Sequence, residues 1–164
     1  MKTNAARTLD RLGIPYDIRT YEVDEAHLGA EIAARKLGLP PEQVFKTLVA
    51  RTGRRDVVLA CIPGNAELDL KALGAAAGGK KAELVALKEV QPLTGYVRGG
   101  VSPIGARRSY PLFLDRTSEA FPTISVSAGL RGVQMLVAPA DLARAVNATV
   151  CDICRTGAPV SDLL

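Results

Sequence analysis

The residue whose type and position most suggest chemistry is Lys46, because it interrupts the apolar run Val44-Phe45-Lys46-Thr47-Leu48-Val49. Side chains of an extended strand alternate between two faces, so Lys46 shares a face with Val44 and Leu48. A lysine on an apolar face extends its ammonium to water, pairs with a carboxylate or points into a polar cavity. Two interpretations follow: this face is a solvated edge, or the ammonium binds a carbonyl or phosphate oxygen.

Two glycine-containing segments could line such a site. Adjacent Gly99 and Gly100, in the loop 99–105, would let the backbone approach a ligand and present N–H groups to an oxyanion or a phosphate. The segment 125–132 ends a predicted strand with small residues and Arg131, as a ligand loop at a sheet rim does. Both segments are also compatible with ordinary turns. The first is not a P-loop, because no Gly-Lys-Ser/Thr follows it.

The sequence contains no recognisable hydrolase nucleophile. There is no Gly-x-Ser-x-Gly elbow. The single histidine, His27, lies in a polar stretch and is predicted to be a surface residue. Tyr21 could present its hydroxyl to a pocket or cover one rim of the core. Any hydrolytic chemistry would therefore not follow the Ser-His pattern.

The three cysteines do not form a metal-binding pattern. Cys151 and Cys154 make one CxxC, Cys61 lies in a distant apolar run, and His27 follows no ligand spacing. A structural zinc site needs four ligands. We therefore expect no metal and no cofactor, and we expect reduced, partly buried thiols.

Length and charge limit the class of protein. The chain has 164 residues, the size of one domain, which we place at 1–155 with a loose C-terminal tail at 156–164. No apolar run approaches the length that crosses a bilayer, so we expect a cytoplasmic protein without a membrane partner. The net charge of +4 permits a polyanionic partner but does not require one. No oligomeric state is predicted.

Helical and strand-like stretches alternate along the chain. Apolar spacing and capping residues predict helices at 4–12, 28–37, 67–77 and 140–146, with a helical turn at 87–90. Strands are predicted at 16–23, 44–50, 57–62, 80–85, 112–115, 123–127, 134–138 and 149–153, the second and third forming a hairpin. The predicted fold class is α/β (α+β): a mixed, partly antiparallel, barrel-like sheet of about seven short strands surrounded by helices.

Several motifs, taken together and in this order, resemble the YbaK family of trans-editing aminoacyl-tRNA deacylases. They include Ile18-Arg19-Thr20-Tyr21-Glu22, Leu37 to Leu48, Gly99-Gly100-Val101-Ser102-Pro103-Ile104-Gly105 and Val126-Ser127-Ala128-Gly129-Leu130-Arg131-Gly132. The resemblance covers about residues 3–155. It implies the fold of the editing domain inserted in bacterial prolyl-tRNA synthetases.

The resemblance also implies a site and an activity. Lys46 matches the essential pocket lysine and is the expected catalytic residue. The expected substrate-binding residues are Tyr21, Thr47, Gly99, Gly100, Val101, Ser102, Ser127, Gly129, Arg131 and Gln134. The implied reaction is hydrolysis of mischarged Cys-tRNA(Pro), and of Cys-tRNA(Cys), in which the substrate's thiol attacks its own ester carbonyl. The implied partners are mischarged tRNA and prolyl-tRNA synthetase.

One position departs from the family, and two other functions stay open. Gln134 stands where YbaK itself has a pocket aspartate, so the position has no charge to pair with Lys46. The first alternative is a deacylase for Ala-tRNA(Pro) or another small mischarged aminoacyl-tRNA. The second is a non-catalytic module that binds aminoacyl-tRNA or a nucleotide.

Overall fold

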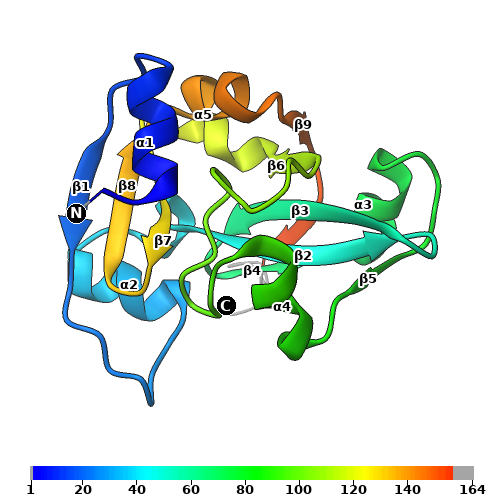
Figure 1. The fold of residues 1–164 in the computed structure, drawn as a ribbon, viewed down its shortest axis with the longest axis horizontal. Helices are drawn as coiled ribbons and strands as arrows, with labels where there is room; N and C mark the ends of the chain where they lie inside the picture. The colour runs from blue at the N-terminus through cyan, green and yellow to red at the C-terminus, as the bar shows by residue number, and fades with distance from the viewer. Residues whose placement is uncertain (1, 157–164) are drawn as a thin grey trace, which may run out of the picture.

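A long hairpin forms the centre of the structure, a computed structural model that describes residues 2–156. Its two strands are β2 (Phe45–Thr52) and β3 (Asp56–Pro63), which pair antiparallel from Phe45 opposite Pro63 to Thr52 opposite Asp56. The hairpin predicted from the two apolar runs is therefore confirmed. The hairpin runs across the middle of the molecule in Figure 1.

The hairpin belongs to a five-stranded mixed sheet in the order β5-β2-β3-β6-β9. Strand β5 (Ala82–Leu84) adds antiparallel to β2, whereas β6 (Leu112–Asp115) and β9 (Thr149–Cys151) add parallel on the other side. Parallel neighbours need crossover segments between them, and these segments carry the helices and the long loop of the fold.

Two smaller antiparallel sheets complete the strands of the described residues. One has the order β1-β8-β7, formed by β1 (Asp17–Thr20), β8 (Val133–Val137) and β7 (Ile124–Leu130). The other joins β10 (Cys154–Thr156) to β4 (Ala66–Leu68). The mixed, partly antiparallel α+β class predicted from the sequence is confirmed. The expectation of a barrel-like sheet is corrected, because within residues 2–156 the strands form three sheets and no closed barrel.

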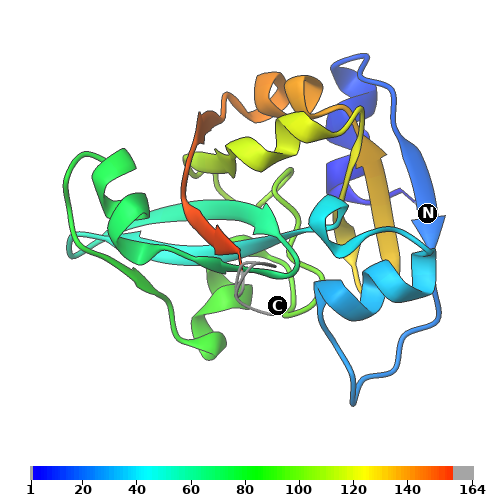
Figure 2. The ribbon, with the colours of Figure 1, turned by 180° about the vertical axis from the view of Figure 1, so that it is seen from behind.

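Short helices surround these sheets. The α-helices are α1 (Asn4–Arg11), α2 (Ala30–Leu37), α3 (Leu70–Ala76), α4 (Leu87–Thr94) and α5 (Pro139–Val146), and the 3₁₀ helices are η1 (Pro41–Gln43) and η2 (Arg116–Ala120). Figures 1 and 2 both show α2 at the foot of the β1-β8-β7 sheet and α4 below the hairpin, beside β5. No helix in the described part of the chain is long and apolar enough to span a membrane.

Apolar residues cover both faces of the hairpin. Phe45, Val49 and Cys61 belong to the larger core, whereas Ala50 and Ile62 belong to the smaller core on the opposite face. A strand buried on both faces reads as a continuous apolar run, which is why the sequence of β3 is uninterrupted.

Two of the differences between the structure and the sequence-based elements concern the β4–β10 pair. The predicted helix 67–77 begins only at Leu70, because Leu68 pairs with Cys154 and the Asp69 carboxylate caps the helix at the Ala72 N–H. The predicted strand 149–153 ends at Cys151 as β9, and a separate strand, β10, begins at Cys154. Both differences come from long-range strand pairing, which local periodicity does not encode. The expected tail 156–164 lies outside the described residues except for Thr156.

The buried carboxylate of Asp115 fixes the connection between β9 and β10. Asp115 is 2% exposed, and its two oxygens accept hydrogen bonds from the Ile153 N–H at 2.9 Å and the Thr117 N–H at 3.0 Å. The second bond caps η2. One side chain thus joins the end of β6 to the segment that follows β9.

We predict that Asp115→Ala lowers the free energy of unfolding by about 2–4 kcal/mol, since it removes a cap and leaves the buried Ile153 N–H without its acceptor. Urea unfolding at neutral pH measures the change. The control is Asp152→Ala, whose side chain is 84% exposed and whose loss should cost at most about 0.5 kcal/mol. Equal midpoints for the two variants would contradict this role of Asp115.

Candidate active site

The edge of β2 that faces away from β3 is open in its first half. Strand β5 pairs only with Ala50–Thr52, after a last contact from the Val85 N–H to the Val49 carbonyl at 3.0 Å. On the other side of the gap, Val44 forms a single parallel bridge to Ser125 of β7. Between these two contacts, no strand among residues 2–156 pairs with residues 46–48 on this edge.

The register shows which peptide group lies at the gap. The Val44 carbonyl accepts from the Gly64 N–H on the β3 side, whereas the Val49 carbonyl accepts from β5. Because peptide groups alternate in direction along a strand, even-numbered residues face β3 and odd-numbered residues face the opposite edge. The N–H and carbonyl of Thr47 therefore face the gap.

A cavity of about 280 Å³ follows this open edge, between residues of α2 and residues of α4. Eight of the eleven residues expected at the site line it: Tyr21, Lys46, Thr47, Gly99, Val101, Ser127, Arg131 and Gln134. Segments that are far apart in the sequence thus meet at one place, as the resemblance implied.

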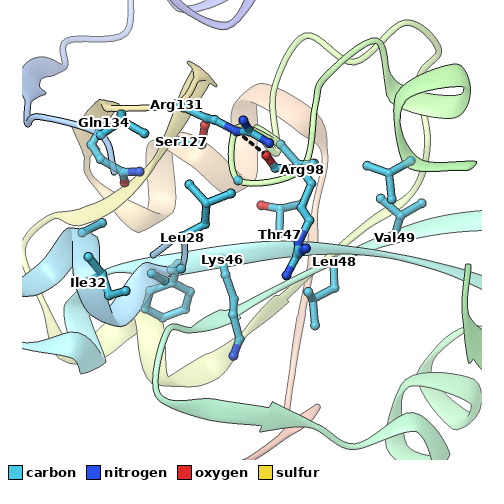
Figure 3. Close-up of a pocket in the computed structure, with 18 of the residues that line it drawn as sticks. Leu28, Ile32, Lys46, Thr47, Leu48, Val49, Arg98, Ser127, Arg131 and Gln134 are labelled. Atoms are coloured by element: carbon cyan, nitrogen blue, oxygen red, sulfur yellow. Dashed lines mark hydrogen bonds between the residues drawn. The ribbon is translucent and has the colours of Figure 1, made fainter. Parts of the chain in front are cut away.

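Lys46 lies on the face of β2 that its spacing predicts, with Leu48 on the same side. Figure 3 shows both side chains pointing to one side of β2, and Thr47 and Val49 pointing to the other side, toward Arg98 and Ser127. The half-buried Lys46 ammonium donates a hydrogen bond to the Gly64 carbonyl at 3.1 Å. An ammonium has three N–H donors, so this bond leaves two for another acceptor.

Gln134 and Ser125 form a buried polar pair at one end of the cavity. The Ser125 hydroxyl donates to the Gln134 Oε1 at 2.7 Å, and both residues are at most 6% exposed. Because Oε1 is engaged in this way, the Gln134 Nε2 remains as a donor group. Ser127 lies opposite Gln134 in the sheet, and its oxygen accepts from the Gly129 N–H at 3.1 Å.

Arg131 joins the β7–β8 turn to the glycine loop. Its Nε donates to the Arg98 carbonyl at 2.8 Å, the bond drawn dashed in Figure 3. Gly99 lies next to the Arg131 side chain, and its φ of +84° is a conformation that favours glycine. Figure 3 shows the Arg98 side chain reaching from this loop toward β2, across the cavity.

Three expected site residues lie outside the cavity. Gly100 is buried, and a β-carbon there would meet the backbone of Leu130 and Arg131 rather than the cavity. Ser102 is fully buried and accepts from the Ile104 N–H at 3.2 Å. Gly129 packs under the ring of Tyr96. Each of these residues shapes the loops that carry the lining residues.

The segment between β1 and α2 supplies lining residues that the sequence did not single out for the site. His27, Asp24 and Leu28 line the cavity beside Tyr21, and Ile32 of α2 adds to this wall. His27 is a surface residue, as predicted, with its side chain 69% exposed. Its Nδ1 lies 2.7 Å from the Asp24 carboxylate, and this hydrogen bond lowers the Asp24 pKa. In the sequence, the only indication that this segment lines the cavity is that it follows Tyr21.

None of the three cysteines lines the cavity, although Cys61 lies opposite Thr47 in the hairpin. Burial raises the pKa of the Cys61 thiol to about 12, and burial beside the Asp115 carboxylate raises that of Cys154 to about 12. Both thiols are therefore protonated at neutral pH, and neither is an activated nucleophile. Within residues 2–156, no group of three or more His, Cys, Asp and Glu side chains is arranged to hold a metal ion.

Comparison with known proteins identifies the family. Residues 24–145 match the model of the aminoacyl-tRNA editing domain. The chain belongs to this aminoacyl-tRNA editing family. Its resemblance to the YbaK family, predicted from the motifs, is thereby confirmed. The matched range includes the lining residues from Asp24 to Gln134.

Two curated relatives of this editing domain carry names that state an activity. A protein of Enterococcus faecalis, named "Putative Cys-tRNA(Pro)/Cys-tRNA(Cys) deacylase EbsC", is 41% identical over 152 residues, 93% of each chain. A protein of Escherichia coli K12, named "Multifunctional Ser/Thr-tRNA deacylase ProXp-y", is 29% identical over 153 residues, 90% of this chain and 89% of that protein.

Solved structures confirm the fold of this editing domain. The hypothetical protein APE2540 superimposes with a TM-score of 0.85 at 24% identity, over 93% of this chain and all of its own. A structure described as "a putative trans-editing enzyme for prolyl tRNA synthetase" gives a TM-score of 0.77, also at 24% identity, over 94% of this chain and 99% of its own.

We predict that Gly129→Ala lowers the free energy of unfolding by about 2–4 kcal/mol. The residue has φ +104°, and a β-carbon would lie 2.7 Å from Cε1 of Tyr96, a ring fixed by its hydroxyl's hydrogen bond to the Ile104 carbonyl.

The matched control is Gly13→Ala, because Gly13 has φ +70° but no neighbour within 4 Å of the added carbon. Backbone strain alone should cost this control about 1–2 kcal/mol. Urea unfolding of both variants isolates the Tyr96 contact, and equal costs would contradict the packing role of Gly129.

Proposed function

We propose that this editing domain hydrolyses mischarged Cys-tRNA(Pro), and also Cys-tRNA(Cys). The observation that carries the proposal is the 41% identity, over 93% of the chain, to the Enterococcus faecalis protein named for these substrates. The cavity supports it, because polar and cationic side chains gather beside an open strand edge that can receive an ester. Deacylation returns free tRNA for correct charging.

The cavity favours a reaction in which the substrate supplies the nucleophile. Its described lining contains no cysteine, and the one lining serine, Ser127, accepts a hydrogen bond from Gly129. The one histidine, His27, is hydrogen-bonded to Asp24, not to a serine. An enzyme nucleophile requires an adjacent activating base. The thiol of a cysteinyl ester needs no such pair in the protein.

The proposed step is intramolecular. The substrate's sulfur forms a bond to its own carbonyl carbon, the bond from that carbon to the ribose oxygen breaks, and the thiol proton passes to the ribose oxygen. The products are tRNA and a cysteine thiolactone, which water opens to cysteine. The protein's contribution is to hold the thiol near the carbonyl and to stabilise the developing oxyanion.

The proposed donors come from different elements: the Thr47 N–H from the open edge of β2, the Lys46 ammonium from the strand face opposite Ser127, and the Gln134 amide from β8. The Thr47 N–H faces the cavity and is the proposed oxyanion donor, with the two remaining hydrogens of the Lys46 ammonium as further donors. The Gln134 Nε2 is the proposed contact to the aminoacyl group, because Ser125 engages the other side of its amide. Gln134 is thus a neutral donor where YbaK itself has an aspartate.

Dependence on the thiol also explains how prolyl-tRNA is spared. A pocket that only excludes larger residues separates substrates by roughly 1–3 kcal/mol per methylene. Proline has no thiol, so it fails the chemical requirement as well as the steric one. Two filters are therefore proposed, the size of the pocket and the thiol of the substrate.

We also propose that prolyl-tRNA synthetase cooperates with this domain in selecting the tRNA. The net charge of +4 provides general attraction to phosphates, which does not distinguish one tRNA from another. A synthetase that already holds its own tRNA would supply the missing selection.

The experiment that tests this function is a deacylation series with Cys-, Ala-, Ser- and Pro-tRNA(Pro), followed by release of the labelled amino acid. We expect rapid release from Cys-tRNA(Pro) only, because the other three esters lack a thiol. Release from Ser-tRNA or Ala-tRNA as fast as from Cys-tRNA would overturn the thiol-dependent proposal and favour the small-residue alternative, to which the name of the Escherichia coli relative points. Binding without any release would favour a non-catalytic module.

We predict that Lys46→Ala lowers kcat/KM for Cys-tRNA(Pro) by about 100-fold or more, the cost of removing one donor from an oxyanion site. Lys81→Ala, whose side chain is 85% exposed, is the matched control and should retain the wild-type rate. Thermal unfolding checks that both variants are folded. Near-wild-type turnover in folded Lys46→Ala would show that this ammonium has no part in the reaction.

A further inference from the structure

One end of the cavity differs in character from the polar end described above. Beyond Thr47, the edge of β2 continues to Val49, and the wall there is formed by Leu84, Val85, Leu87 and Val90 of β5, α4 and the segment between them. These four side chains are apolar. The cavity therefore has one end near Gln134, where polar groups meet α2, and an apolar end near α4, and neither the family match nor the relatives' names assign a role to the apolar end.

This apolar wall remains open to solvent in the described residues. Leu84 and Leu87 are 51% and 65% exposed, and they are two of only six large apolar side chains that are exposed in residues 2–156. A single exposed leucine is ordinary, but two at the mouth of one cavity, beside the half-buried Val85, form a continuous surface suited to a flat apolar ligand.

The wall is held rigidly against the strand. The Val85 N–H donates to the Val49 carbonyl, and the Arg51 guanidinium donates to the Glu89 carboxylate of α4 at 2.6 Å. The hydrogen bond from Arg51 lowers the Glu89 pKa, so this carboxylate is ionised and its charge is paired with the guanidinium. These two contacts tie β5 and α4 to β2.

A cation without a carboxylate partner lies between the two ends. Arg98 reaches across the cavity toward β2 (Figure 3), and among residues 2–156 no carboxylate lies within 4 Å of its guanidinium. An arginine without a carboxylate partner can bind a phosphate, and an apolar wall beside it can bury the face of a base, so the two together can receive a nucleotide.

We propose that the apolar end, formed by Val49, Leu84, Val85, Leu87 and Val90, is the subsite for the terminal adenine of tRNA, and that Arg98 binds the phosphate on its 5′ side. The inference rests on the proposed function, since every tRNA ends in an adenosine whose ribose carries the ester. Thr47 and Val49 are two residues apart, about 7 Å along the strand. An ester held at Thr47 thus places its base, one ribose away, against Val49 and the leucines.

The test compares two cysteinyl esters: 3′-cysteinyl-adenosine, released from Cys-tRNA by a nuclease, and the cysteinyl ester of methyl riboside, which lacks the base. Wild-type protein should prefer the adenosine ester in kcat/KM. Leu87→Ala should reduce this preference about fivefold to tenfold, mainly through KM, because it removes apolar surface that the base would bury.

The matched control is Leu12→Ala, a substitution of a leucine that is 49% exposed and does not line the cavity. The Leu12→Ala variant should prefer the adenosine ester over the methyl riboside ester by the same factor as the wild type. An unchanged preference in Leu87→Ala would overturn the subsite even if Cys-tRNA is still deacylated, so failure of the subsite is distinguishable from failure of the proposed function.

A binding measurement reads the same subsite without activity. Adenosine 5′-monophosphate titrated into the wild-type protein should shift the amide resonances of Val49, Val85 and Val90, and Arg98→Ala should weaken this binding about tenfold or more. Shifts located elsewhere, or no saturable binding, would overturn the subsite. Binding here combined with an unchanged ester preference in Leu87→Ala would assign the surface to a free nucleotide and overturn its assignment to tRNA.

Discussion

The arrangement of the site depends on where β5 begins to pair with β2. Pairing starts at Ala50, and on the other side of the gap β7 contacts β2 only at Val44. The peptide group of Thr47 is left facing a cavity instead of another strand. Elsewhere an unpaired edge is a liability that proteins cover. Here the same exposed donors are a means of holding a polar ligand.

The remaining lining residues reach this edge because other elements end beside it. The β7–β8 turn brings Ser127, Arg131 and Gln134, and Arg131 in turn holds the loop that carries Arg98 and Gly99. Hydrogen bonds to the backbone make most of these connections, so the cavity is shaped by loops fixed to rigid strands. This is the usual way in which a fold presents a binding site.

The sequence predicted those features that depend on local rules. The alternation of side chains placed Lys46 on the same face as Leu48, and Gly38 ends α2 in the left-handed conformation that a C-cap glycine adopts. The motifs of the family located the loops 99–105 and 126–132, which lie next to each other in the structure through the Arg131 hydrogen bond. These features need little information from distant parts of the chain.

Features that depend on tertiary contacts were not predictable. Leu68 looked helical, but it pairs with Cys154 across the fold. Gly129 looked like a ligand contact, but the ring of Tyr96 occupies the space that a β-carbon would need. The apolar end of the cavity had no signature, because Leu84 and Leu87 gain their common role only when β5 and α4 meet the edge of β2. Motifs located the site, and packing determined its extent.

The most direct test of the account concerns the Thr47 amide. Hydrogen exchange would be measured with and without an uncleavable analogue, cysteine joined by an amide bond to 3′-amino-3′-deoxyadenosine. The account predicts that the analogue slows exchange at Thr47, whose peptide group faces the cavity, and leaves exchange at Leu48, whose peptide group faces β3, unchanged. Exchange at Thr47 that the analogue does not alter would contradict the claim that the open edge of β2 holds the substrate.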